Sequence, residues 1–131
     1  MKLLLDTHVI LWALEDSFEL PVPIREIICD EKNEIYISTI SLWEISIKHK
    51  KSPDKMIYSA KQIRDYCQRA GYIFLSLSVD NITKYDELDL SSNMDPFDQI
   101  LTSQAMSNNM VLLTHDKKIA NYNLPCIKFF N

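Results

Sequence analysis

The sequence of 131 residues has a single glycine, Gly71, and only five prolines. Such a low content of both residues excludes collagen-like chains and low-complexity linkers. Hydrophobic residues make up 47% of the chain, which is enough to fill one continuous core. We therefore expect one folded domain over residues 1–131.

Cysteine is also scarce, and long hydrophobic runs are missing. Cys29, Cys67 and Cys126 are far apart, with no CxxC pair and no histidine at zinc-finger spacing, so reduced core thiols are expected. No segment approaches the roughly 18 to 20 apolar residues that a membrane helix requires. The apolar first segment is interrupted by Asp6 and His8 and lacks a cleavage site, which argues against a signal peptide. We expect a soluble, cytoplasmic protein.

A net positive charge is missing too. The net charge is −4 and the pI about 5.3, whereas proteins that bind nucleic acid are usually basic. However, seven of the 14 basic residues lie between Lys48 and Arg69, together with only two acids. Lys48, Lys50 and Lys51 are therefore candidates for contacts with phosphate groups. The alternative is a basic helix face exposed to solvent.

Short apolar runs alternate along the chain with segments of helical spacing. Strands are predicted over residues 2–5, 35–37, 72–77, 111–113 and 126–130. Helices are predicted over residues 9–14, 22–29, 39–49, 55–69, 82–88, 97–107 and 117–120. This alternation, with strands that show no polar face, is typical of a parallel sheet covered by helices on both sides. The predicted fold class is a three-layer α/β fold with about four to five parallel strands.

Acidic residues fall where such sheets bind ligands, beyond the carboxyl ends of the strands. Asp6 follows the first strand, Glu44 lies early in the helix after the second strand, and Asp116 follows the fourth strand. Asp98 lies in the first turn of a helix, where the dipole favours an anion. Carboxylates gathered at one edge repel one another unless a cation compensates, and oxygen ligands suit Mg²⁺ or Mn²⁺. We predict that all four acids are catalytic and that Asp6, Asp98 and Asp116 bind the metal.

The acids other than Asp6 also have structural explanations. Asp95 is a good N-cap followed by proline, so capping is favoured for Asp95 and the ligand role for Asp98. Glu44 could extend into solvent, and Asp116 could serve only as the cap of a short helix. These alternatives remain open at the level of sequence.

Hydroxyl groups accompany the acids. Thr7 and Thr114 lie beside them and could orient them or a bound water. The spacing of Ser41, Glu44 and Lys48 places a hydroxyl, a carboxylate and an ammonium on one helix face. We therefore expect Thr7, Thr114 and Ser41, together with Asp95, to support the site.

Hydrolysis at such a site needs no protein nucleophile. One or two divalent ions can deprotonate a water and stabilise the charge that develops on a phosphodiester. The three histidines have no spacing that indicates a zinc site or a Ser/His pair. We interpret His8, His49 and His115 as non-ligands.

Four segments resemble the PIN-domain family, specifically the VapC-type toxins: residues 3–8 (LLLDTH), 38–48 (STISLWEISIK), 95–98 (DPFD) and 112–116 (LLTHD). The resemblance spans nearly the whole chain. It implies a PIN-like three-layer fold, Mg²⁺- or Mn²⁺-dependent endoribonuclease activity, homodimers and a cognate antitoxin. It also maps the family's acidic residues onto Asp6, Glu44, Asp98 and Asp116.

The chain departs from that pattern around DPFD. Relatives often carry a His-Arg pair before this motif and an arginine after it, where this sequence has Asn93, Met94 and Gln99. The departure concerns contacts with substrate phosphates or with the antitoxin, and the segment from Lys48 to Lys55 could take a larger share of them.

Other functions fit less well. A phosphatase of the haloacid dehalogenase type needs a second aspartate where this chain has His8, and a response-regulator receiver needs an acidic pair on its first strand. The remaining alternative is a catalytically silent PIN-like module that holds RNA or a partner protein, which the retention of all four acids disfavours. Trp12, Phe18 and Tyr58 could form partner surfaces, although core positions are favoured.

Overall fold

The computed structural model describes residues 1–89 and 95–130. A sheet of five strands, all paired in parallel, has the order β3-β2-β1-β4-β5. The strands are β1 (Lys2–Leu5), β2 (Glu34–Ser38), β3 (Ile73–Leu75), β4 (Val111–Thr114) and β5 (Ile127–Phe129).

Seven helices occur in the described residues: two lie between each pair of successive strands from β1 to β4, and one lies between β4 and β5. They are α1 (Thr7–Glu15), α2 (Val22–Cys29), α3 (Thr39–Lys51), α4 (Ala60–Arg69), α5 (Val79–Asp86), α6 (Pro96–Ser107) and α7 (Lys117–Ala120). Within the two described ranges, no helix combines the length and the apolar character needed to cross a bilayer.

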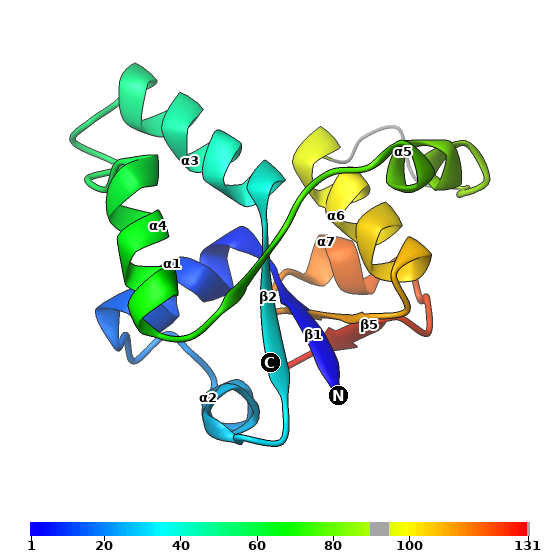
Figure 1. Cartoon of the computed structure of the whole chain (residues 1–131), viewed down its shortest axis with the longest axis horizontal. Helices are drawn as coiled ribbons and strands as arrows, with labels where there is room; N and C mark the ends of the chain where they lie inside the picture. The colour runs from blue at the N-terminus through cyan, green and yellow to red at the C-terminus, as the bar shows by residue number, and fades with distance from the viewer. Residues whose placement is uncertain (90–94, 131) are drawn as a thin grey trace.

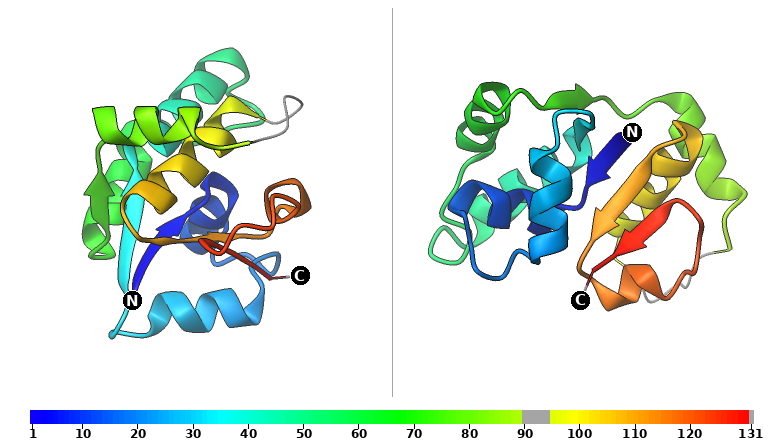
Figure 2. Two further views of the ribbon diagram at one scale, coloured as in Figure 1. Left: turned by 90° about the vertical axis from the view of Figure 1, so that its right-hand side faces the viewer. Right: turned by 90° about the horizontal axis from the view of Figure 1, so that it is seen from below.

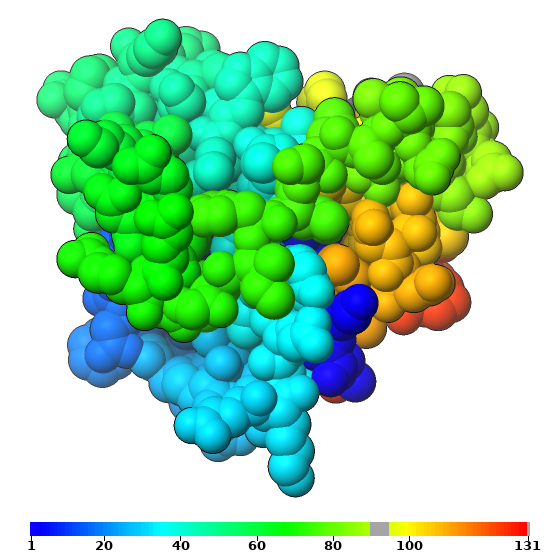
Figure 3. Space-filling model, in the orientation of Figure 1, coloured from blue at the N-terminus to red at the C-terminus, as the bar shows by residue number. Residues whose placement is uncertain are grey.

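The helices form a layer on each side of the sheet (Figures 1 and 2). Side chains alternate between the faces of a strand, so Leu3 and Leu5 pack with residues of α1, α2 and α4. Leu4 points the other way and packs with residues of α6 and α7. The segment from α4 to α5 forms a continuous band across one side of the molecule (Figure 3). The predicted fold class, a three-layer α/β fold with a parallel sheet, is confirmed.

Several helix boundaries differ from those predicted, because caps decided them. The helix predicted over residues 55–69 begins only at Ala60: Ser59 accepts a hydrogen bond from the Gln62 backbone N–H at 3.2 Å, and the Gln62 side chain accepts from the Ser59 N–H at 2.9 Å. Ser78 caps α5 in the same way, so this helix begins at Val79 and not at residue 82. The third strand, predicted over residues 72–77, is limited to Ile73–Leu75.

Side chains assigned from the sequence to the core or to partner surfaces are distributed unevenly. Cys67 is buried and, like Cys29 and Cys126, forms no disulfide. Trp12 and Tyr58 are partly buried against the larger core cluster. Phe18 is wholly exposed, so the prediction that favoured a core position is wrong for this residue. It lies in the turn after α1, where no helix covers it.

The strand order creates a crevice beside the middle of the sheet. The chain runs outward from β1 through β2 to β3, and then returns to place β4 on the opposite side of β1. Beyond the carboxyl ends of β1 and β4, the connections therefore leave in opposite directions. Parallel sheets bind their ligands at such switch points.

We predict that replacing Ile37 by alanine lowers the free energy of unfolding by about 2–5 kcal/mol, because the side chain is fully buried on β2. Ile73→Ala on the edge strand β3, where the side chain is 43% exposed, is the matched control and should cost about 1 kcal/mol or less. Urea denaturation of both variants measures the difference, and equal losses would contradict the described core.

Candidate active site

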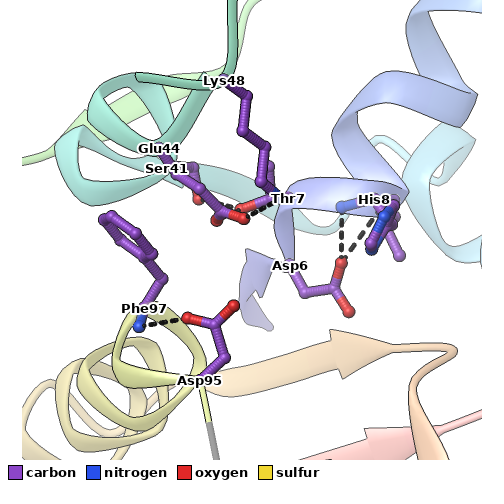
Figure 4. A network of polar contacts seen from close by, with 9 residues as sticks. Asp6, Thr7, His8, Ser41, Glu44, Lys48, Asp95 and Phe97 are labelled. Atoms are coloured by element: carbon purple, nitrogen blue, oxygen red, sulfur yellow. Dashed lines mark hydrogen bonds and ion pairs between the residues drawn. The ribbon is translucent and has the colours of Figure 1, made fainter. Parts of the chain in front are cut away.

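A pocket of about 140 Å³ lies at the carboxyl ends of β1 and β4. Five carboxylates line it: Asp6, Glu44, Asp95, Asp98 and Asp116. Its other lining residues are Thr7, His8, Lys48 and Lys118. Asp6 follows β1, Glu44 lies on α3 and Asp95 precedes α6, so these side chains come from three different parts of the fold (Figure 4). The fold thus brings together the four acids predicted as catalytic, with Asp95 as a fifth.

Both carboxylate oxygens of Asp6 accept hydrogen bonds. As the N-cap of α1, its Oδ1 accepts from the backbone N–H groups of His8 at 2.8 Å and Val9 at 3.2 Å. Its Oδ2 accepts from the Thr114 hydroxyl at 2.5 Å. Burial raises the pKa of the Asp6 carboxyl, and these hydrogen bonds act in the opposite direction. The sequence did not reveal this capping role, because helical periodicity was apparent only from residue 9.

Thr114 connects Asp6 to Asp116. Its hydroxyl donates to Asp6 and accepts from the backbone N–H of Asp116 at 2.9 Å. Asp116 caps α7, since its Oδ1 accepts from the Lys118 N–H at 2.8 Å, and it also lines the pocket. Asp116 therefore both caps α7 and lines the pocket, although these roles are alternatives at the level of sequence.

Glu44 is buried, with only 4% of its surface exposed, so the solvent-facing alternative is wrong. Its Oε1 accepts from the Thr7 hydroxyl at 2.7 Å, and its Oε2 is 2.6 Å from the Lys48 ammonium one helical turn away. The buried Ser41 hydroxyl lies 3.1 Å from that of Thr7. These contacts fix the orientation of the carboxylate, and they place Lys48 inside the acidic site.

The carboxyl group of Asp98 is half-buried among the other acids of the pocket. Burial, followed by the negative charges of Asp95, Asp6, Glu44 and Asp116, raises its pKa from 3.8 to about 7. Asp95 itself is exposed and caps α6, accepting from the Phe97 N–H at 2.8 Å. A half-buried acid with a pKa near neutrality among other carboxylates is typical of a functional site that requires positive charge.

Gln99, which replaces an arginine of the resembled family, does not face solvent. Its side chain is 7% exposed, and its Oε1 accepts from the Tyr85 hydroxyl at 2.7 Å. It therefore links α6 to α5. Asn93 and Met94, the other two departures, lie outside the described residues.

The carboxylate oxygens that line the pocket are the kind of ligand that a hard divalent cation prefers. The described side chains include no group of three or more His, Cys, Asp or Glu residues that is already arranged to hold a metal. Magnesium, however, commonly binds through one or two carboxylates and keeps several waters. Asp6, Asp98 and Asp116 are the residues that could hold such an ion.

His8 occupies a place that the sequence did not predict. Besides the carboxylate pocket, it lines a cavity of about 270 Å³ with Asp6, Trp12, His115, Asp116 and Lys117. It also lines a third cavity, of about 400 Å³, with Lys48, Lys51, Ser52, Lys55 and Met56. Lys50 is not part of the lining of these three pockets. The only signal in the sequence was the spacing of His8 and Trp12, one helical turn apart.

We predict that Asp98→Asn stabilises the metal-free protein at pH 8. The folded-state pKa lies above the unfolded value, so the free energy of unfolding falls as the pH rises from about 4 to about 7. Allowing for partial exposure, removal of the charge should raise the free energy of unfolding by about 1–2 kcal/mol at pH 8 and change it little at pH 4. Urea denaturation at both pH values tests this, with Glu31→Gln on the exposed surface as the control. A loss of stability at pH 8 would contradict the described electrostatics.

Comparisons with solved structures show the same fold over whole chains. The crystal structure of VapBC2 from Rickettsia felis bound to a promoter DNA fragment matches with a TM-score of 0.72 and 21% identity, covering 100% of both chains. DNA-bound VapBC from Salmonella typhimurium matches with a TM-score of 0.70 and 20% identity, over 99% of this chain and 97% of the other. VapBC-1 from nontypeable Haemophilus influenzae also matches with a TM-score of 0.70 and 20% identity, over 98% of each chain.

The sequence itself supplies the assignment to a family. A comparison with curated proteins gives no match. The family model of the PIN domain, by contrast, matches residues 3–124, which contain all five carboxylates of the pocket. The chain therefore belongs to the PIN-domain family.

Proposed function

We propose that this protein is a metal-dependent endoribonuclease and the toxin of a toxin–antitoxin pair. The observation that carries the proposal is the gathering of five carboxylates at the switch point of the sheet, where burial and the charges of the neighbouring acids raise the pKa of Asp98 to about 7. Membership of the PIN family and the likeness of the fold to VapBC structures support it. The cellular compartment in which it would act is the cytoplasm.

In this proposal, Asp6, Asp98 and Asp116 hold Mg²⁺ or Mn²⁺. Such an ion supplies an activated water and stabilises charge on a phosphodiester. Glu44, oriented by Thr7 and Lys48, accepts the proton of the attacking water.

The supporting residues act through the acids. Thr114 sets the relative positions of Asp6 and Asp116, and Ser41 holds the Thr7 hydroxyl near Glu44. Asp95 adds negative charge at the mouth of the pocket while it caps α6.

The substrate is proposed to be RNA, bound through its phosphates. Lys48, Lys51 and Lys55 line the third cavity, which meets the carboxylate pocket at His8 and Lys48. Lys48 is paired with Glu44, so Lys51 and Lys55 are the lysines available for backbone contacts. Lys50 is a weaker candidate than the sequence indicated, because it lies outside this lining.

We also propose that the chain forms homodimers and binds a cognate antitoxin. Solved structures of similar fold include VapBC complexes and a toxin–antitoxin complex from Klebsiella pneumoniae, which matches with 18% identity and a TM-score of 0.65. Phe18 and Val22 are exposed close together in the sequence and offer apolar surface to a partner.

We predict metal-dependent cleavage by the purified protein on a panel of RNAs. EDTA should abolish cleavage, and Mg²⁺ or Mn²⁺ should restore it. Asp6→Asn, Glu44→Gln and Asp98→Asn should each lower kcat by about 100- to 1000-fold, because each removes a group that acts on the reacting phosphate or water. Glu31→Gln, an exposed acid outside the pocket, should retain full activity.

Two outcomes would overturn the proposal. Metal-dependent cleavage that survives in all three pocket variants would exclude this site. RNA binding without cleavage of any RNA would indicate instead a catalytically silent module.

A second prediction concerns the lysines. The double variant Lys51→Gln/Lys55→Gln should raise KM roughly fivefold at low salt, with kcat unchanged, because it removes contacts with phosphates. The increase should shrink at high salt, where such contacts are screened. Lys61→Gln, an exposed lysine on α4 outside the cavity, is the control. A KM that does not change would exclude this face as the RNA-binding surface.

A further inference from the structure

We propose that the cavity beside the carboxylates is a nucleobase subsite, which holds one unpaired base of the RNA against Trp12. The inference rests on the proposed function, because it names the form of substrate that the site accepts. The cavity has a volume of about 270 Å³ and shares Asp6, His8 and Asp116 with the carboxylate pocket. A base inside it therefore lies next to the phosphate at the acids.

Aromatic rings form the walls of this cavity. His8 and Trp12 lie one turn apart on α1, with ring centroids 5.9 Å apart. His115, which follows β4, meets the Trp12 ring edge-on at 5.3 Å. These flat side chains come from two segments more than 100 residues apart, and the pairing of β1 with β4 brings them together.

The His115 ring is fixed in place. Its Nδ1 donates to the Phe130 carbonyl at 2.5 Å, which assigns the proton to that nitrogen, since a carbonyl only accepts. Its other side is stacked on Phe129 at 6.0 Å, with 13° between the planes. Trp12 is held by its partial burial against the core. The walls formed by Trp12 and His115 are thus oriented before a ligand binds, which reduces the entropy lost on binding.

A base fits this cavity better than other occupants do. The volume lies just below the range of sites for drug-sized molecules, so a single flat ring system suits it and a folded peptide segment does not. Proteins that bind single-stranded RNA stack unpaired bases on aromatic side chains in this way. Lys117 at the edge of the cavity supplies a positive charge for a neighbouring phosphate.

The three cavities define a path for the strand. His8 lines all three, and the carboxylate pocket shares Lys48 with the lysine-lined cavity and Asp6 and Asp116 with the aromatic cavity. An RNA strand that follows them contacts Lys51 and Lys55 with its backbone, passes the carboxylates, and turns one base into the aromatic cavity. Because a base stacked on Trp12 cannot remain in a duplex, the substrate must be unpaired next to the cleaved bond.

The two tryptophans of the chain allow a direct binding test. Trp43→Phe leaves Trp12 as the only tryptophan, whereas Trp12→Phe leaves Trp43, which is 59% exposed on α3 and outside the cavity. Adenosine and uridine 5′-monophosphates should quench the emission of Trp12 saturably, and ribose 5-phosphate should not. Neither compound should quench Trp43 saturably.

Each other outcome of this binding test counts against the subsite. Equal quenching by ribose 5-phosphate would assign the cavity to phosphate alone. Equal quenching of both reporters would indicate nonspecific binding, and no quenching would exclude a base subsite. Quenching by N-acetyl-phenylalanine amide but not by nucleotides would assign the cavity to a protein side chain instead.

Cleavage provides a second, independent readout. Trp12→Leu keeps apolar contact with the core but cannot stack, so it should raise KM about tenfold on an RNA with an unpaired base at the cleavage site. Wild-type protein should prefer this RNA to one with an abasic nucleotide there, and Trp12→Leu should not distinguish the two. A uniform loss of activity on both RNAs, with a lowered urea midpoint, would show a merely structural role and overturn the proposal. If nucleotides bind at Trp12 and no RNA is cleaved, the nuclease function fails while the base subsite stands.

Discussion

The pairing of β1 with β4 is the constraint on which the site depends. It brings Asp6 and Thr114, 108 positions apart, within hydrogen-bond distance at the carboxyl ends of the two strands. The same hydroxyl accepts from the Asp116 backbone, so one side chain sets the spacing of two acids. Asp6 also starts α1, which carries Thr7, His8 and Trp12 into the site. The end of the central strand thus positions all three cavities.

The carboxylates are arranged against their own electrostatic preference. A folded protein can hold several acids together only if caps, hydroxyl groups and ammonium groups offset part of the repulsion. Here backbone N–H groups at the starts of three helices donate hydrogen bonds to Asp6, Asp95 and Asp116. Thr7 and Lys48 donate to Glu44. Burial, together with the charges of the four neighbouring acids, raises the pKa of Asp98 to about 7. Such a site gains stability when a cation enters, which couples the fold to the proposed chemistry.

A protein with a negative net charge can still offer suitable local contacts to an RNA strand. The net charge of −4 includes the acids of the pocket, which a metal would neutralise in part. The lysines of α3 and of the turn after it line one cavity that adjoins the carboxylate pocket, and the aromatic rings line another. Local arrangement, and not the total charge, therefore decides what the surface can bind.

The sequence by itself determined the fold class and pointed to the four acids that we propose as catalytic, because strand and helix periodicity and short motifs are local properties. It also indicated that Asp95 is a helix cap. It could not decide that Glu44 is buried or that Gln99 faces α5, because both depend on which helices pack together. Nor could it show that Trp12 and His115 form one cavity, since they meet only through the pairing of β1 with β4. Strand order and packing are long-range properties, and only the tertiary structure decided them.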